Sequence, residues 1–309
     1  MGNKDAHWQD FLAPRYWIIW LGLALLRFMA FLPFKSGLWF GKQLGNLLYF
    51  SMPKRRRVTE VNIRLCFPEL EPKQQQAMVK EVFHNNGRGL VEMTWAYWGN
   101  KNFFRSITTL KGAEILHTAR EAGNGVILMG GHYSMIDLCG LLFSFYDVPV
   151  STLYRRHNNP LMDWFFCRHR SRFSEPLDRD KTRQMLRHMR KNNCIWYAPD
   201  QDLGAKGSVF VPYFGQTACT ITATSKMAKL NGSPLVLLCC QRNADNSGYT
   251  LEVKTVENFP SGDETKDAAI INYAIESCVR RAPSQYMWVH KRFKTQPDGN
   301  QKLYKANNC

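Results

Sequence analysis

The apolar residues of the chain are most concentrated in one run near its start. Residues 16–34, YWIIWLGLALLRFMAFLPF, contain a single charged side chain, Arg27. In a helix, a run of this length matches the hydrocarbon core of a bilayer, which is roughly 30 Å thick. The run predicts a membrane-anchoring, transmembrane helix within an N-terminal anchor, residues 1–34. Arg27 and Pro33 weaken a full span, so a tilted or interfacial helix and a buried helix of a soluble protein stay open.

Beyond residue 34 the pattern changes to short apolar runs that alternate with helical spacing. Residues 36–50 and 72–98 repeat apolar positions at the helical period. The short strand-like runs are 125–129, 148–153, 194–198, 234–240 and 249–255, and helical patterns occupy about 135–146, 160–172, 180–191, 217–231 and 266–280. Strands interleaved with crossover helices predict an α/β fold, a mixed central sheet flanked by helices, in one domain of residues 35–309.

The charge of the chain indicates an anionic partner. The 41 Lys and Arg residues exceed the 25 Asp and Glu residues by +16, which suits nucleic acid, an acidic membrane surface or a phosphorylated substrate. The basic run Lys54-Arg55-Arg56-Arg57 follows the apolar run closely, so the positive-inside rule places residues 35–309 on the cytoplasmic side. No small-residue cleavage site follows the apolar run, which argues against a removed signal peptide.

The cysteines predict no further chemistry. They are nine in number and scattered, and none has CxxC spacing, so neither a disulfide framework nor a zinc site is expected and a reducing compartment is indicated. Asp200 and Asp202 lack an evident third ligand, and no cofactor is expected. No recognition helix, RNP motif or zinc spacing supports nucleic acid as the partner, which makes a basic membrane-associated nucleic-acid-binding protein the least favoured alternative.

The candidate chemistry lies in GGHYSMIDLCG, residues 130–140, directly after an apolar strand-like run. Substrate sites of α/β sheets lie in such strand-to-helix loops, and the glycines permit the turn. A histidine such as His132 accepts a proton near neutral pH, and a carboxylate such as Asp137 orients the ring and stabilises the imidazolium. The spacing alone is a weak signal, and a polar surface turn is the alternative. Ser134 is a poor candidate nucleophile because GxSxG is missing.

Two further groups of residues are candidates for substrate binding. Arg155, Arg156, Arg168, Arg170 and Arg172 lie in one stretch and would suit phosphate if they gather at the site, although a solvated helix surface is the competing interpretation. The developing oxyanion of an acyl transfer would be held by backbone N–H groups of the GGH turn or by Arg155.

The H-x4-D pair after an apolar strand resembles the catalytic signature of the glycerolipid acyltransferase superfamily. Five further stretches are similar to the lipid A biosynthesis acyltransferases of Gram-negative bacteria, in order along nearly the whole chain: PRYWIIWLG (14–22), NIRLCFPE (62–69), YRRHNNPLMDW (154–164), WYAPDQDLGAKGSVFVPYFG (196–215) and APSQYMWVHKRFKT (282–295). Tyr154-Arg155 and the QYMWVHKRFK ending resemble the lauroyl-type branch. Members of that branch often carry Glu where this chain has Asp137, which is one methylene shorter.

The resemblance implies transfer of a fatty acyl chain from acyl carrier protein to a hydroxyl of a hydroxyacyl chain on a Kdo-bearing lipid A precursor. His132 would be the general base and Asp137 its orienting partner, at the cytoplasmic face of the inner membrane. The acidic carrier protein and an anionic glycolipid acceptor both suit the charge of +16. An acyltransferase for lysophospholipid or glycerol phosphate is the alternative.

The same resemblance suggests which residues contact the substrates. Arg155 is carried over from the YR motif, and Asp200 and Lys206 stand where the superfamily has a substrate-binding loop, although an Asp- and Gly-rich turn is a competing interpretation. The predicted substrate-binding residues are Arg155, Arg170, Asp200 and Lys206. The sequence assigns no acyl chain length, acceptor position or oligomeric state, and no role to Trp288 or His290.

Overall fold

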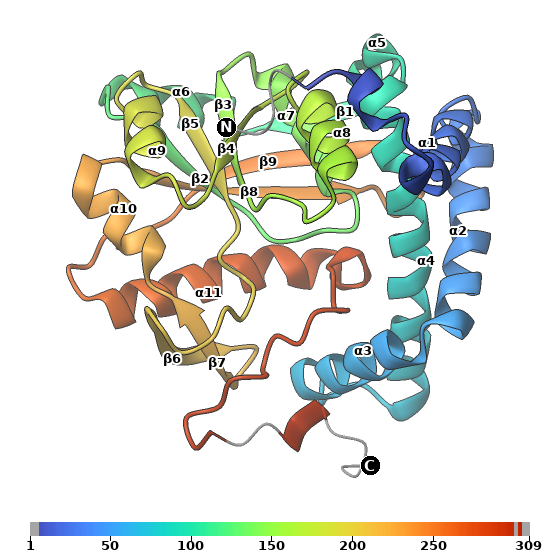
Figure 1. Ribbon diagram of the computed structural model, residues 1–309. Helices are drawn as coiled ribbons and strands as arrows, with labels where there is room; N and C mark the ends of the chain where they lie inside the picture. The colour runs from blue at the N-terminus through green and yellow to red at the C-terminus, as the bar shows by residue number, and fades with distance from the viewer. Residues whose placement is uncertain (1–5, 300–301, 305–309) are drawn as a thin grey trace.

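The computed structural model describes residues 6–299 and 302–304, and its centre is a seven-stranded sheet with the order β1-β9-β8-β2-β5-β3-β4 (Figure 1). The strands are β1 (Thr108–Lys111), β2 (Val126–Met129), β3 (Val150–Tyr154), β4 (Glu175–Asp178), β5 (Cys194–Tyr197), β8 (Leu235–Arg242) and β9 (Tyr249–Thr255). Neighbouring strands are parallel except β8 and β9, which are antiparallel. The predicted mixed sheet flanked by helices is confirmed.

Strand β2 lies near the middle of the sheet, between β8 and β5. All four of its side chains are fully buried, because a central parallel strand is covered by helices on both faces. The GGH turn leaves the carboxyl end of this strand and leads into α7 (Ile136–Phe143). The fully buried centre of the sheet therefore positions the candidate chemistry.

Helices surround the sheet, and a small hairpin extends from it. The helices after the first two are α3 (Pro53–Cys66), α4 (Pro72–Trp98), α5 (Lys101–Ser106), α6 (Ala113–Glu121), α7, α8 (Pro160–Arg170), α9 (Thr182–Met189), α10 (Ala223–Asn231) and α11 (Glu264–Arg281). The hairpin consists of β6 (Ser208–Tyr213) and β7 (Gln216–Ile221), and it packs against α11.

The apolar run 16–34 is not one helix. Helix α1 (Trp17–Met29) ends before Pro33, and α2 (Phe34–Ser51) begins directly after it. A proline ring is tolerated at a helix start and not in its interior. Helix α1 (Trp17–Met29) has 13 residues, about 20 Å of helix against a hydrocarbon core of about 30 Å. Within residues 6–299 and 302–304, no helix has the length and apolar character needed to cross a membrane, so a spanning anchor is unsupported.

Helices α1, α2 and α4 stand together at one end of the molecule (Figure 1). Helix α2 directs a row of glycines, Gly37, Gly41 and Gly45, at α4. Gly87 of α4 faces the backbone of Gly41 and Gly45. Small residues at such a spacing let two helix backbones approach closely. Close packing on α4 leaves the opposite side of α2 uncovered.

Four of the cysteines form disulfides, so the prediction of no disulfide is wrong for them. Cys139 of α7 is bonded to Cys240, and Cys278 of α11 is bonded to Cys239. Adjacent residues of a strand point to opposite faces, so β8 is linked to one helix on each face of the sheet. The spacing along the sequence does not reveal pairs that form only when helices pack on a strand.

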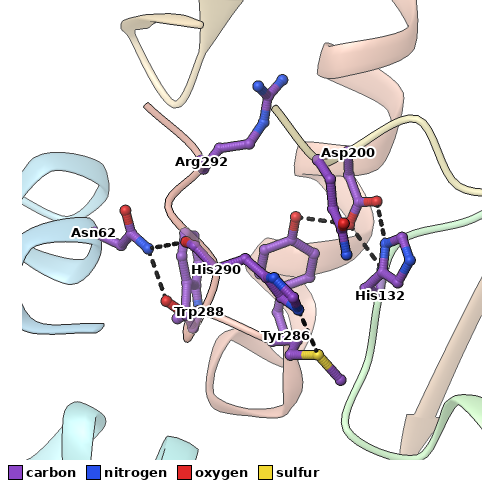
Figure 2. Close-up of a pocket in the computed structure, with 9 residues that line it drawn as sticks. Asn62, His132, Asp200, Tyr286, Trp288, His290 and Arg292 are labelled. Carbon is purple, nitrogen blue, oxygen red and sulfur yellow. Dashed lines mark hydrogen bonds and ion pairs between the residues drawn. The ribbon is translucent and has the colours of Figure 1, made fainter. Parts of the chain in front are cut away.

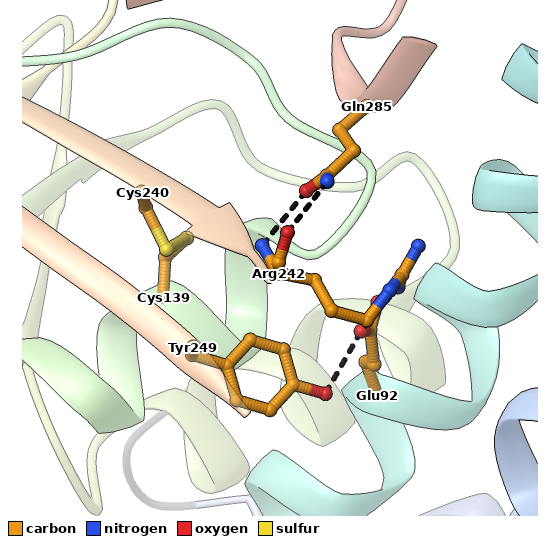
Figure 3. The surroundings of a disulfide bond; sticks show 6 residues. All are labelled: Glu92, Cys139, Cys240, Arg242, Tyr249 and Gln285. Atoms are coloured by element: carbon orange, nitrogen blue, oxygen red, sulfur yellow. Dashed lines mark hydrogen bonds and ion pairs between the residues drawn. A yellow bond between two sulfur atoms is a disulfide. The ribbon is translucent and has the colours of Figure 1, made fainter. Parts of the chain in front are cut away.

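Beside the first disulfide lies a buried ion pair (Figure 3). Arg242 at the end of β8 donates from Nη1 to Glu92 Oε1 at 2.6 Å, and Tyr249 Oη donates to the same oxygen at 2.9 Å. Gln285 bonds the backbone N–H and C=O of Arg242 with its side-chain amide, both at 2.8 Å. This cluster ties α4 to the sheet and to the segment that follows α11.

We predict that Gly87→Ala destabilises the protein. A Cβ atom at this position would collide with the backbone of Gly41 and Gly45, and overpacking of this kind costs about 1–3 kcal/mol. A thermal melt should show a lower Tm. Gly22→Ala in α1 is the matched control, because a Cβ there has no atom within 4 Å. Equal melting of wild type and Gly87→Ala would contradict the close packing of α2 on α4.

Candidate active site

His132 and Asp200 meet at the carboxyl edge of the sheet (Figure 2). The backbone N–H of His132 donates to Asp200 Oδ2 at 2.8 Å, and its ring Nδ1 lies 2.5 Å from Asp200 Oδ1. Asp200 follows β5, which pairs with β2 in parallel, so the loops after both strands leave the sheet at the same edge. Asp200 is only 2% exposed.

The electrostatics of this pair favour charge on both partners. Burial would raise the pKa of Asp200, but the charge of His132 and its two hydrogen bonds lower it to about 2. Burial likewise opposes the imidazolium form of His132, yet the attraction and hydrogen bond of Asp200 outweigh it and raise the pKa. With Nδ1–H directed at the carboxylate, the neutral ring carries its lone pair on Nε2.

Asp137 is not the partner of His132 that the sequence predicted. Its side chain forms a two-point ion pair with Arg170, in which Nε donates to Oδ1 at 2.6 Å and an Nη donates to Oδ2 at 3.1 Å. The opening turn of α7 points Asp137 at the end of α8, and a planar guanidinium matches both carboxylate oxygens. Asp200, which the sequence placed among the substrate-binding residues, takes the position beside the ring.

The four predicted substrate-binding residues differ in their positions and contacts. Asp200 contacts His132, and Arg170 contacts Asp137. Arg155, which follows β3, and Lys206, between β5 and β6, are exposed. Within the described residues, neither contacts either pair, and no group of three His, Cys, Asp or Glu side chains could hold a metal ion.

The segment after α11, residues 284–295, crosses the site, and we name it the C-terminal strap. Tyr286 Oη donates to Asp200 Oδ2 at 2.7 Å. The backbone N–H of Met287 donates to the carbonyl of His132 at 2.9 Å, and that of Ser134 donates to the carbonyl of Gln285 at 2.9 Å. The strap thus completes the site from the end of the chain.

A buried asparagine holds the strap in place. Asn62 of α3 donates from Nδ2 to the carbonyls of Trp288, at 2.7 Å, and His290, at 2.8 Å. Farther along, Thr295 donates to Asp202 from its backbone N–H at 2.7 Å and from Oγ1 at 2.9 Å. Sequence reasoning gave Asn62 and Thr295 no role, and the signals were the family-like stretches 62–69 and 282–295 that contain them.

His132 and Asp200 line one small cavity together with residues of the strap (Figure 2). Its lining includes Asn62, His132, Asp200, Tyr286, Trp288, His290 and Arg292. His132 reaches the cavity from the loop after β2, whereas His290 reaches it from the strap. The arrangement provides a fixed imidazole that is suited to proton transfer.

Comparison with known proteins assigns the family. The model of the bacterial lipid A biosynthesis acyltransferases matches residues 6–295. The chain belongs to this family. It is thus an acyltransferase of lipid A biosynthesis, and the resemblance seen in the sequence is confirmed.

Individual lipid A biosynthesis acyltransferases are similar over almost their whole length. The lauroyltransferase of Escherichia coli (strain K12) is 36% identical over 93% of this chain and 95% of its own. The palmitoleoyltransferase of the same strain is 34% identical over 96% and 97%, and the myristoyltransferase is 26% identical over 96% and 93%. The lauroyl- and palmitoleoyltransferases are thus more similar to this chain than the myristoyltransferase is.

We predict that the two carboxylates of this lipid A acyltransferase act differently on His132. In Asp200→Asn the attraction is lost while burial remains, so the pKa of His132 should fall below its ordinary value. Asp137→Asn should change it little, because Asp137 pairs with Arg170. NMR titration of the His132 ring measures both variants. An equal fall in Asp137→Asn would contradict the observed pairing.

Proposed function

We propose that this acyltransferase transfers a fatty acyl chain from acyl carrier protein to a hydroxyl of a hydroxyacyl chain on a Kdo-bearing lipid A precursor. The observation that carries the proposal is the His132 ring, which a buried carboxylate fixes beside a cavity in a chain of this family. The product is an acyloxyacyl group. The net charge of +16 supports an acidic donor protein and an anionic glycolipid acceptor.

His132 acts as the general base. Its Nε2 takes the proton of the acceptor hydroxyl while that oxygen forms a bond to the thioester carbon. The C–S bond then breaks, and the imidazolium returns the proton to the departing thiolate. Asp200 holds the ring and stabilises the imidazolium between the two steps. The substrate itself supplies the nucleophile.

Ser134 does not serve as an enzyme nucleophile in this proposal. Its Oγ is buried and has no hydrogen-bond partner among the described residues, so no base is in place to activate it. A serine hydroxyl needs an adjacent base before it can attack a thioester. The acyl chain therefore passes directly from the donor to the acceptor, without an acyl-enzyme intermediate.

We assign to Arg170 the binding of an anionic group of the substrate. Burial opposes its charge, but Asp137 outweighs burial and raises the pKa of Arg170. A guanidinium has five N–H donors, and Asp137 occupies two of them. Asp137 thus keeps Arg170 charged and oriented, and Arg155 and Lys206 would add exposed positive charge for phosphate or for the carrier protein.

The uncovered sides of α1 and α2 form an apolar face that would lie in the surface of the inner membrane. On α1 it contains Ile18, Leu21, Leu25 and Phe28, which are 61–79% exposed and spaced along one side of the helix. On α2 it contains Leu47 and Phe50, which are 62% and 70% exposed. Apolar patches of this extent mark interaction sites, and helices of this kind lie in the lipid interface.

Charge supports a cytoplasmic, anionic lipid surface. Lys54 and Arg55 follow the apolar face at the start of α3 and are exposed. Basic side chains beside an anionic leaflet each contribute about 1 kcal/mol to binding. Attachment by an interfacial face would bring the lipid acceptor to the site without a spanning helix.

We predict that His132→Ala lowers kcat by about 10²–10⁴, the usual contribution of positioned acid–base catalysis. The assay supplies acyl carrier protein carrying a fatty acyl chain, together with either the Kdo-bearing precursor or a lysophospholipid. Ser134→Ala is the control and should remain active without accumulating acylated protein. Preference for the lysophospholipid would overturn the proposed acceptor, and a fully active His132→Ala would overturn the proposed base.

We predict that the double variant Leu21→Gln and Leu25→Gln binds anionic vesicles about tenfold more weakly or worse, since each leucine withdrawn from water contributes on the order of 1–2 kcal/mol. Leu230→Gln in α10 is the matched control, because Leu230 and Leu21 are both 62% exposed. Cosedimentation with vesicles measures binding. If the double variant and the control bind alike, the apolar face of α1 and α2 is not the attachment surface.

A further inference from the structure

His290 stands opposite the proposed base, and its imidazole has no role in the mechanism so far. The ring centroids of His132 and His290 are 6.4 Å apart, and both rings line the same cavity (Figure 2). Asn62 fixes the backbone on which His290 is carried. The buried Asn62 thus fixes the position of His290.

Among the residues that the structure describes, the one polar contact of the His290 ring is weak. Its Nε2 lies 3.2 Å from Met287 Sδ, and a thioether sulfur is a poor acceptor. An N–H group held against sulfur loses little when an oxygen with negative charge replaces the sulfur. His290 thus offers a hydrogen-bond donor that the folded protein itself scarcely uses.

Two of the three backbone N–H groups of the GGH turn, which the sequence suggested as the oxyanion site, already have acceptors. The backbone N–H of Gly130 donates to the carbonyl of Tyr197 at 3.1 Å, and that of His132 donates to Asp200 Oδ2 at 2.8 Å. Arg155, the other candidate, is exposed. The turn itself thus offers a thioester carbonyl only the N–H of Gly131, and the strap is the element that faces His132 with a further donor.

The surroundings keep this donor neutral. Burial, and then the positive charge of His132, lower the pKa of His290 below its ordinary value, and Arg55 acts in the same direction against the opposing effect of Asp200. A neutral imidazole still donates one hydrogen bond, and it does not repel the imidazolium that forms on His132. Neutral histidines are effective donors to developing oxyanions.

We propose that His290 is a catalytic residue that donates a hydrogen bond from Nε2–H to the carbonyl oxygen of the acyl thioester during attack. This inference rests on the proposed function. As the acceptor oxygen bonds to the carbonyl carbon, the C=O electron pair moves to the oxygen that His290 holds. When the C–S bond breaks, the pair returns to form the ester carbonyl. His290 keeps its own proton, and only the proton held by His132 passes to the thiolate.

The test compares His290→Ala with His290→Gln, because the Gln side-chain amide restores a neutral N–H at a similar distance from the backbone. His290→Ala should lower kcat by about 10²–10³, the usual effect of removing one oxyanion donor, with little change in KM for either substrate. His290→Gln should recover part of the loss. His188→Ala is the matched control, since His188 is also half-buried but lies on α9 near the start of β3.

A second measurement separates oxyanion binding from other roles. Slow hydrolysis of the same acyl thioester without a lipid acceptor passes through the same oxyanion, so His290→Ala should lower transfer and hydrolysis by similar factors at an unchanged Tm. The inference would be overturned if His290→Ala lowered the rate of transfer but not that of hydrolysis. It would also be overturned if the rates fell only in variants with a lower Tm. A preference of the wild type for lysophospholipid would overturn the proposed acceptor instead. Wild type and His290→Ala would then be compared with lysophospholipid as the acceptor.

Discussion

The buried charge of Asp200 is the constraint on which the site depends. A carboxylate withdrawn from water is costly unless donors surround it, and here the donors come from distant parts of the chain: the backbone and ring of His132 after β2, and Tyr286 of the strap. Satisfying one side chain therefore brings together the ends of two strands and the end of the chain. The orientation of His132 follows from this requirement.

The sequence predicted the part of this arrangement that is local. The apolar run of β2 and the glycines after it place His132 in a strand-to-helix loop, and that loop lies at the carboxyl edge of the sheet as expected. The partner of His132 was not predictable in the same way. Whether Asp137 or Asp200 lies beside the ring depends on which strand neighbours β2, and the pairing of β2 with β5 is set by the whole sheet.

The N-terminal region shows a second limit of pattern reading. The same apolar residues suit a spanning helix, an interfacial helix or a buried one, and only the break at Pro33 and the close packing of Gly41 and Gly45 on α4 decide which sides stay uncovered. The disulfides escaped prediction for a related reason. Cys239 and Cys240 are adjacent in sequence, but they meet partners on opposite faces of the sheet.

The strap also gives the protein an order of assembly during synthesis. Tyr286 and His290 leave the ribosome after His132 and Asp200. Until the strap arrives, Asp200 lacks the Tyr286 hydroxyl, and the cavity lacks one wall. A nascent chain that still lacks the strap thus has no closed site. A premature stop codon between residues 200 and 286 would leave His132 and Asp200 in the polypeptide and still remove the strap that encloses them.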